Sequence, residues 1–222
     1  MRNRRSAMLA AAAAIAFALD TSAREPGGTQ SSASDIIRGW PHVSQQAAQR
    51  TIERYGEPDA VSDRMLVWHD NGPWKRTIVH RDEAPHNFPR AHTDVIEQTI
   101  SYRVPADKFD ELASFDGSVT ADRTRGELSA TCDREEMNFL ALNLADEVVN
   151  GKRGVMEARQ FYGQTVTMTE AGRESEYTQK LLFKSRGPAA DPDQALAEIE
   201  ANPVVAPETN ETKDRPRRGG GD

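Results

Sequence analysis

The chain has 222 residues and carries 28 Lys and Arg against 35 Asp and Glu, which gives a formal net charge of −7 at pH 7. Nucleic-acid phosphates and anionic lipid surfaces repel so acidic a protein, and we exclude both as default partners. The single cysteine, Cys132, excludes an internal disulfide, and the length suits one domain with tails.

Residues 1–23 have the order of a secretory signal peptide. A start rich in arginine precedes thirteen apolar residues, 7–19, and a small-residue cleavage site ends at Ala23. Thirteen residues form a helix of about 20 Å, shorter than a hydrocarbon core of roughly 30 Å, so we expect no membrane span. We predict an exported, periplasmic or secreted protein. The Arg4-Arg5 pair matches only part of a twin-arginine signal, so the export route stays open.

Both flanks of the remaining chain are poor in apolar residues. Residues 24–35 are rich in Gly, Ser, Thr and Gln, which predicts a flexible leader. Residues 187–222 combine prolines with many polar residues and cannot bury enough apolar surface to offset their ordering entropy. We therefore predict a disordered tail over 187–222 and a single domain over 36–186.

The first half of this domain predicts one helix followed by strands. The expected elements are a helix over 43–55, a hairpin of strands over 65–69 and 74–81, an ordered loop over 82–92, and a strand over 93–104. The Asn71-Gly72 pair tolerates positive φ and predicts the turn of the hairpin. Pro85 and Pro89 are the reason for expecting a loop over 82–92.

The second half predicts a further hairpin between helices. The expected elements are a helix over 106–115, strands over 119–122 and 127–131, a helix opening at Asp133, a turn over 151–154, and a last helix from Val155. Asp133 and Glu136 have the spacing of a capping box. Strands in hairpins without alternating helices predict an α+β fold, an antiparallel sheet with helices packed on one side.

Potential metal ligands gather between residues 69 and 97. Four of the five histidines fall there, and His80, His86, His92 and Asp94 are the set that could bind Zn²⁺ or Cu²⁺, or act in acid–base hydrolysis. Their spacing matches no tight metal motif. The alternative is that these histidines are polar surface residues beside two tryptophans, with no cofactor.

A second hypothesis concerns recognition. Pro85 and Pro89 fix the backbone on both sides of His86 and Phe88, and a fixed loop loses little entropy on binding. The hairpin and this loop would together present a binding surface, made of Trp68, Trp74, His86 and Phe88. The alternative is that Phe88 fills the core beneath a rigid connector.

Cys132 is interpreted first as a small buried residue at the end of a strand. Its sequence neighbours, Thr131, Asp133 and Arg134, supply no histidine, so we do not expect it to be a nucleophile. The alternative use of a lone thiol in an oxidising compartment is a disulfide between two chains.

Several stretches carry a resemblance to a family. They are Tyr55-Gly56-Glu57-Pro58-Asp59, Leu66-Val67-Trp68-His69-Asp70-Asn71-Gly72-Pro73-Trp74, His86-Asn87-Phe88-Pro89, and Gly126-Glu127-Leu128-Ser129-Ala130. Together, over about residues 45–165, they resemble a group of exported bacterial proteins of no assigned activity. More loosely, the helix with its Gly-x-Pro end and the tryptophan strand are similar to small outer-membrane assembly lipoproteins and β-lactamase-inhibitor-type modules. That resemblance implies binding, although this chain lacks the lipidated cysteine.

These observations favour an exported binding or envelope-associated protein without catalytic activity. Its partner would be a protein or small ligand of the cell envelope, and self-assembly is a further alternative. The competing hypothesis is a metal-dependent or histidine/carboxylate hydrolase that uses the 69–97 cluster.

Overall fold

The computed structural model describes residues 32–184, so the predicted signal peptide and tail lie outside the described residues. The predicted leader, 24–35, overlaps the first helix, α1 (Ala33–Ile37), and is wrong over its last residues. Ser32 and Asp35 form a capping box there, because each side chain accepts a hydrogen bond from the other residue's backbone N–H. Ile37 then packs into the core.

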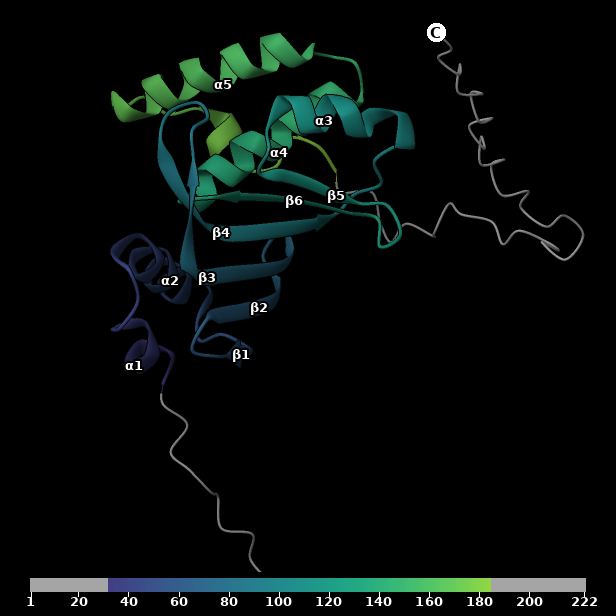
Figure 1. Cartoon of the computed structure of the whole chain (residues 1–222). Helices are drawn as coiled ribbons and strands as arrows, with labels where there is room; N and C mark the ends of the chain where they lie inside the picture. The colour runs from purple at the N-terminus through teal and green to yellow at the C-terminus, as the bar shows by residue number, and fades with distance from the viewer. Residues whose placement is uncertain (1–31, 185–222) are drawn as a thin grey trace, which may run out of the picture.

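The described residues form helices and one antiparallel sheet (Figure 1). The other helices are α2 (His42–Tyr55), α3 (Phe109–Phe115), α4 (Glu135–Val149) and α5 (Val155–Glu170), with single 3₁₀ turns at Ala106–Lys108 and Glu176–Thr178. The strands are β1 (Ala60–Val61), β2 (Met65–Asn71), β3 (Trp74–His86), β4 (His92–Ser101), β5 (Val119–Asp122) and β6 (Glu127–Cys132), in the order β1-β2-β3-β4-β6-β5. The predicted α+β class is confirmed.

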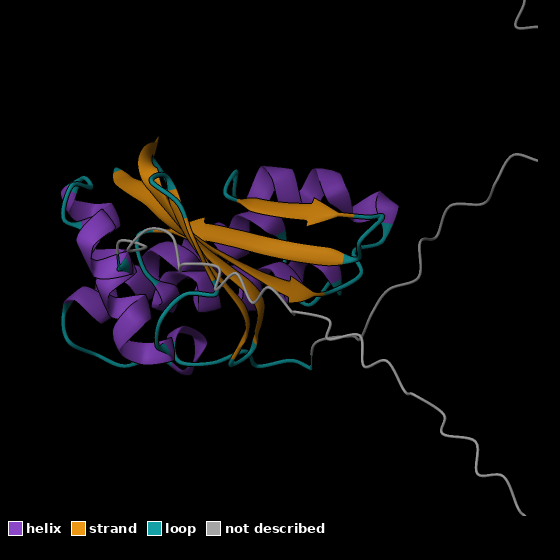
Figure 2. Ribbon diagram, turned by 90° about the horizontal axis from the view of Figure 1, so that it is seen from below, coloured by secondary structure: helices purple, strands orange, loops and turns teal. Residues whose placement is uncertain are grey.

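The sheet is twisted (Figure 2). Its strand register puts apolar side chains in rows on one face. One row crosses four strands through Leu66, Val79, Ile96 and Cys132, all buried. The helices α2 and α4 cover this face, α2 over β2–β3–β4 and α4 over β4–β6, and α5 packs outside α3 and α4. In the described residues no helix combines the length and hydrophobicity of a bilayer span.

A buried carboxylate joins the parts of the core under α2 and under α4. Glu135 Oε1 accepts hydrogen bonds from Tyr55 Oη at 2.5 Å, Trp74 Nε1 at 2.5 Å and Gln98 Nε2 at 3.2 Å. Its Oε2 lies 2.7 Å from the guanidinium of Arg54. Four elements, α2, β3, β4 and α4, therefore meet at one side chain.

The prediction of a loop over 82–92 is wrong. The strand β3 continues to His86 and β4 begins at His92, with a register shift between Val79 and Ala84. The strand β2 pairs with β3 only as far as His80. Pro85 lies beyond this pairing, so its lack of a backbone N–H costs no hydrogen bond to β2. The bulge is held by α2, because Glu83 Oε1 accepts from the N–H of Val43 at 3.1 Å.

The expected capping box at the start of α4 is also not formed. The helix begins at Glu135, and its N-cap residue, Arg134, makes no side-chain cap. Asp133 instead pairs with the Arg134 guanidinium at 2.8 Å. This leaves Asp133 beside Cys132, at the edge of the site described next.

Candidate functional site

The end of the β3–β4 hairpin brings two imidazoles and a carboxylate together. His86 and His92 are direct cross-strand partners, and their ring centroids lie 4.9 Å apart. Asp94 follows His92 by two residues and therefore points to the same face of the strand. One potential ligand atom from each of the three lies within 4.8 Å of the other two. We call this group the His–His–Asp triad.

Asp94 is the centre of the triad and is deeply buried, with 7 % of its side chain exposed. Its Oδ2 accepts a hydrogen bond from the Ser118 hydroxyl and lies 3.3 Å from His86 Nδ1. Its Oδ1 lies 3.0 Å from His92 Nε2, yet it accepts no hydrogen bond from any described residue. A buried carboxylate oxygen without a donor is costly, and it marks a place where a missing partner would be favourable.

Each imidazole is held through its outer nitrogen. His92 Nδ1 lies 2.9 Å from the carbonyl oxygen of Arg90, and His86 Nε2 lies 3.6 Å from Asp116 Oδ1. The Asp116 carboxyl is itself buried, and burial raises its pKa above the ordinary value. The inner nitrogens, His86 Nδ1 and His92 Nε2, are thereby turned toward Asp94.

Cys132 extends the site along β6. Its Sγ lies 3.4 Å from His92 Nε2 and 3.5 Å from Asp133 Oδ1. The contact with Asp94, followed by that with Cys132, raises the pKa of His92 to about 11, while burial raises the pKa of the thiol. At neutral pH the thiol and the imidazole are therefore both protonated, which is the wrong pairing for an activated thiolate nucleophile.

Sequence reasoning missed this contact because His92 lies 40 positions before Cys132. Cys132 is 5 % exposed, as expected of a small buried residue at a strand end. A disulfide between two folded copies needs an exposed sulfur, so this burial argues against a dimer linked through Cys132.

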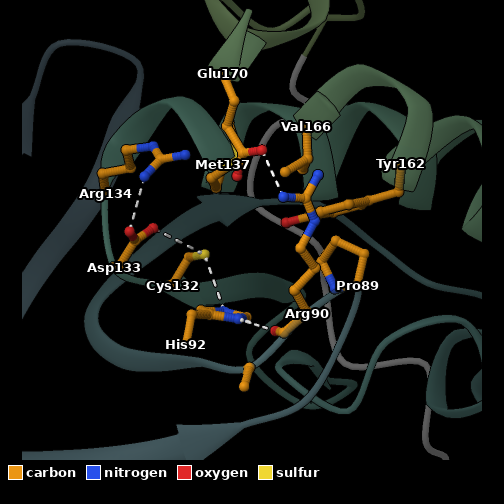
Figure 3. A pocket seen from close by; sticks show the side chains of 11 residues that line it. Pro89, Arg90, His92, Cys132, Asp133, Arg134, Met137, Tyr162, Val166 and Glu170 are labelled. Atoms are coloured by element: carbon orange, nitrogen blue, oxygen red, sulfur yellow. Dashed lines mark hydrogen bonds and ion pairs between the residues drawn. The ribbon is translucent and has the colours of Figure 1, made fainter. Parts of the chain in front are cut away.

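A pocket of about 320 Å³ opens beside the triad (Figure 3). His92 and Cys132 line one side of it, and Tyr162 and Val166 of α5 line the other. Ion pairs flank the pocket, with Arg90 2.6 Å from Glu170 and Arg134 paired to Asp133. The pocket therefore gives access to the triad from the side of His92.

The prediction that the two tryptophans form part of a binding surface is wrong. Trp68 is 2 % exposed and donates its indole N–H to the Gly56 carbonyl, while Trp74 is 1 % exposed and donates to Glu135. Phe88 is partly buried against Phe115 and Tyr162, under the Arg159 guanidinium at 3.9 Å. These three aromatic rings are packing residues, and His86 alone of the expected four belongs to the site.

The expected metal set is brought together in part. His86, His92 and Asp94 converge, but His80 does not, because it precedes the bulge of β3 and points to the opposite face. There its Nε2 lies 3.4 Å from Glu97 Oε2. His69 also lies apart and pairs with Asp59 at 3.4 Å.

No protein-family model, curated protein or solved structure matches this chain. The geometry of the triad and its surroundings is therefore the basis for a functional assignment.

Proposed function

We propose that this chain is an exported envelope protein that binds a transition-metal ion, Zn²⁺ or Cu²⁺, at the His–His–Asp triad. Imidazole nitrogens and a carboxylate oxygen are ligands that both ions accept. The convergence of the triad carries the proposal, because one ligand atom each of His86, His92 and Asp94 lies within 4.8 Å of the other two.

The surroundings of the imidazoles support the same function. Histidine ligands in metal sites usually donate their outer N–H to a carboxylate or a backbone carbonyl, which fixes the ring. Here the Arg90 carbonyl has that position for His92 at 2.9 Å, and Asp116 Oδ1 lies 3.6 Å from the outer nitrogen of His86, just beyond hydrogen-bond distance. A bound dication would also offset the buried charge of Asp94.

A second candidate function is a metal-dependent hydrolase. Three protein ligands are the usual number in catalytic zinc sites, which leave one position for water or substrate. The pocket of about 320 Å³ beside His92 favours this alternative. It predicts that the zinc-loaded protein hydrolyses simple ester or phosphoester substrates, and that the metal-free protein does not.

Calorimetric titration of the secreted, processed chain with Zn²⁺ tests the proposal. We expect one ion per chain, and a loss of affinity of roughly 100-fold or more in H92A and in D94N, since outer residues alone already contribute 10–100-fold. H80A is the matched control, because that imidazole lies outside the triad. Absence of Zn²⁺ and Cu²⁺ binding by the wild-type chain, or equal affinity in D94N, would overturn the proposal.

The envelope location has its own test. Fractionation of cells of the source organism should place the protein outside the cytoplasm, with Arg24 as its first residue. Unprocessed chain in the cytoplasm would contradict the location and leave the metal site untouched.

A further inference from the structure

We infer that Cys132 is the fourth ligand of the triad, and that its sulfur makes this a site for Zn²⁺ rather than for Mn²⁺ or Mg²⁺. The inference rests on the proposed function. It goes further because it completes the coordination shell and excludes the ions that prefer oxygen ligands.

The distances around His92 are those of neighbouring ligands in a tetrahedral shell. Zn–S and Zn–N bonds of about 2.3 and 2.05 Å at the tetrahedral angle place sulfur and nitrogen about 3.6 Å apart, and two N or O ligands about 3.3 Å apart. The structure has 3.4 Å between Cys132 Sγ and His92 Nε2, 3.0 Å from His92 Nε2 to Asp94 Oδ1, and 3.3 Å from His86 Nδ1 to Asp94 Oδ2. Each separation is within about 0.3 Å of the expected one.

Two independent observations point to a ligand at this place. One is Cys132 Sγ at 3.4 Å from His92 Nε2, and the other is the convergence of ligand atoms of His86, His92 and the buried Asp94 within 4.8 Å. Cys132 is not among the ligand atoms that all lie within 4.8 Å of one another, so binding by all four residues requires the sulfur to move toward the triad. The adjoining pocket is lined by Cys132 and His92, and it gives an ion access to these two side chains.

Charge and softness then select the ion. With neutral imidazoles, the Asp94 carboxylate and a Cys132 thiolate carry two negative charges, which balance one dication in a buried site. Coordination releases the Cys132 thiol proton and the second proton of His92 to solvent, so the S–H bond and one N–H bond are broken. Thiolate with imidazole favours Zn²⁺ over Mg²⁺ and Mn²⁺, which prefer oxygen ligands.

Titration of the processed chain with Co²⁺, a spectroscopic substitute for Zn²⁺, tests the inference. Visible d–d bands report that the ion is bound, and a near-ultraviolet thiolate-to-Co²⁺ charge-transfer band reports a bond to sulfur. Because the chain has one cysteine, that band has one source and the wild-type spectrum decides. We expect both bands in the wild type and in H80A, and both bands to vanish when Zn²⁺ is added.

The variant C132S separates the two proposals. We expect it to keep d–d bands, to lose the charge-transfer band and to bind Zn²⁺ at least about tenfold more weakly. Wild-type d–d bands without charge transfer would overturn the role of Cys132 and leave the triad as a three-ligand site. Absence of any Co²⁺ or Zn²⁺ binding would overturn both.

Discussion

Glu135 is the side chain whose loss we expect to damage the fold most directly. Its carboxylate accepts hydrogen bonds from Tyr55, Trp74 and Gln98 and pairs with Arg54. In E135A the buried indole N–H and the Gln98 amide lose an acceptor, and each buried donor left unpaired costs about 1–3 kcal/mol. Breaking a buried charged network costs about 3–5 kcal/mol, and we expect E135A to lower the free energy of unfolding by that amount.

Urea denaturation followed by circular dichroism and tryptophan fluorescence measures this effect on the metal-free chain. E135Q keeps a carbonyl acceptor and loses the charge, so we expect a smaller loss, about 1–2 kcal/mol. E136A is the matched control, since its neighbouring side chain is exposed and should change stability by no more than about 0.5 kcal/mol. A loss below about 1 kcal/mol in E135A would refute the assignment of Glu135 as the junction of the two core regions.

The remaining predictions concern the site and the packing beside it. Zn²⁺ at 100 times its dissociation constant should raise the free energy of unfolding by about 2.7 kcal/mol, and D94A should abolish the gain in thermal melts with and without the ion. D116N should keep the fold and weaken Zn²⁺ binding about 10–100-fold in calorimetry, whereas unchanged affinity would mean that Asp116 does not orient His86. F88A should lower the free energy of unfolding by about 2–3 kcal/mol in urea melts, less than the loss of a fully buried phenylalanine. An effect near zero would mean that Phe88 does not pack against the core.

The sheet and its helices could be predicted because their signals are local. Alternation along β4, the Asn71-Gly72 turn and the apolar stripe of α4 each lie within one segment. The tryptophans were misplaced because their partners are distant. The indole of Trp74 donates to Glu135, 61 positions later, and no local pattern reveals that acceptor.

Sequence reasoning named the residues of the triad as candidate ligands but did not predict how they are arranged. Pro85 and the polar residues around it predict a loop, yet the hairpin continues through them and pairs His86 with His92. With that pairing known, the i, i+2 spacing of His92 and Asp94 would have put all three on one face. His80 is excluded only by the register shift between Val79 and Ala84, which alternation does not reveal. Cys132 needed the β4–β6 register, a long-range contact that sequence spacing does not contain.

The place of the triad in the fold bears on how an ion would act on the protein. Residues 81–91, the end of the β3–β4 hairpin, are exposed or half-buried and lie beyond the pairing with β2, so their main contact with the core is the packing of Phe88 against Phe115 and Tyr162. On the side of the triad their contacts are with Ser118 and Asp116, from the segment between α3 and β5, and with Cys132 on β6. An ion held by the triad and Cys132 would join the hairpin end to β6. Its binding free energy would therefore oppose local opening of the hairpin before it affected global unfolding, because the core beneath α2 and α4 closes without it.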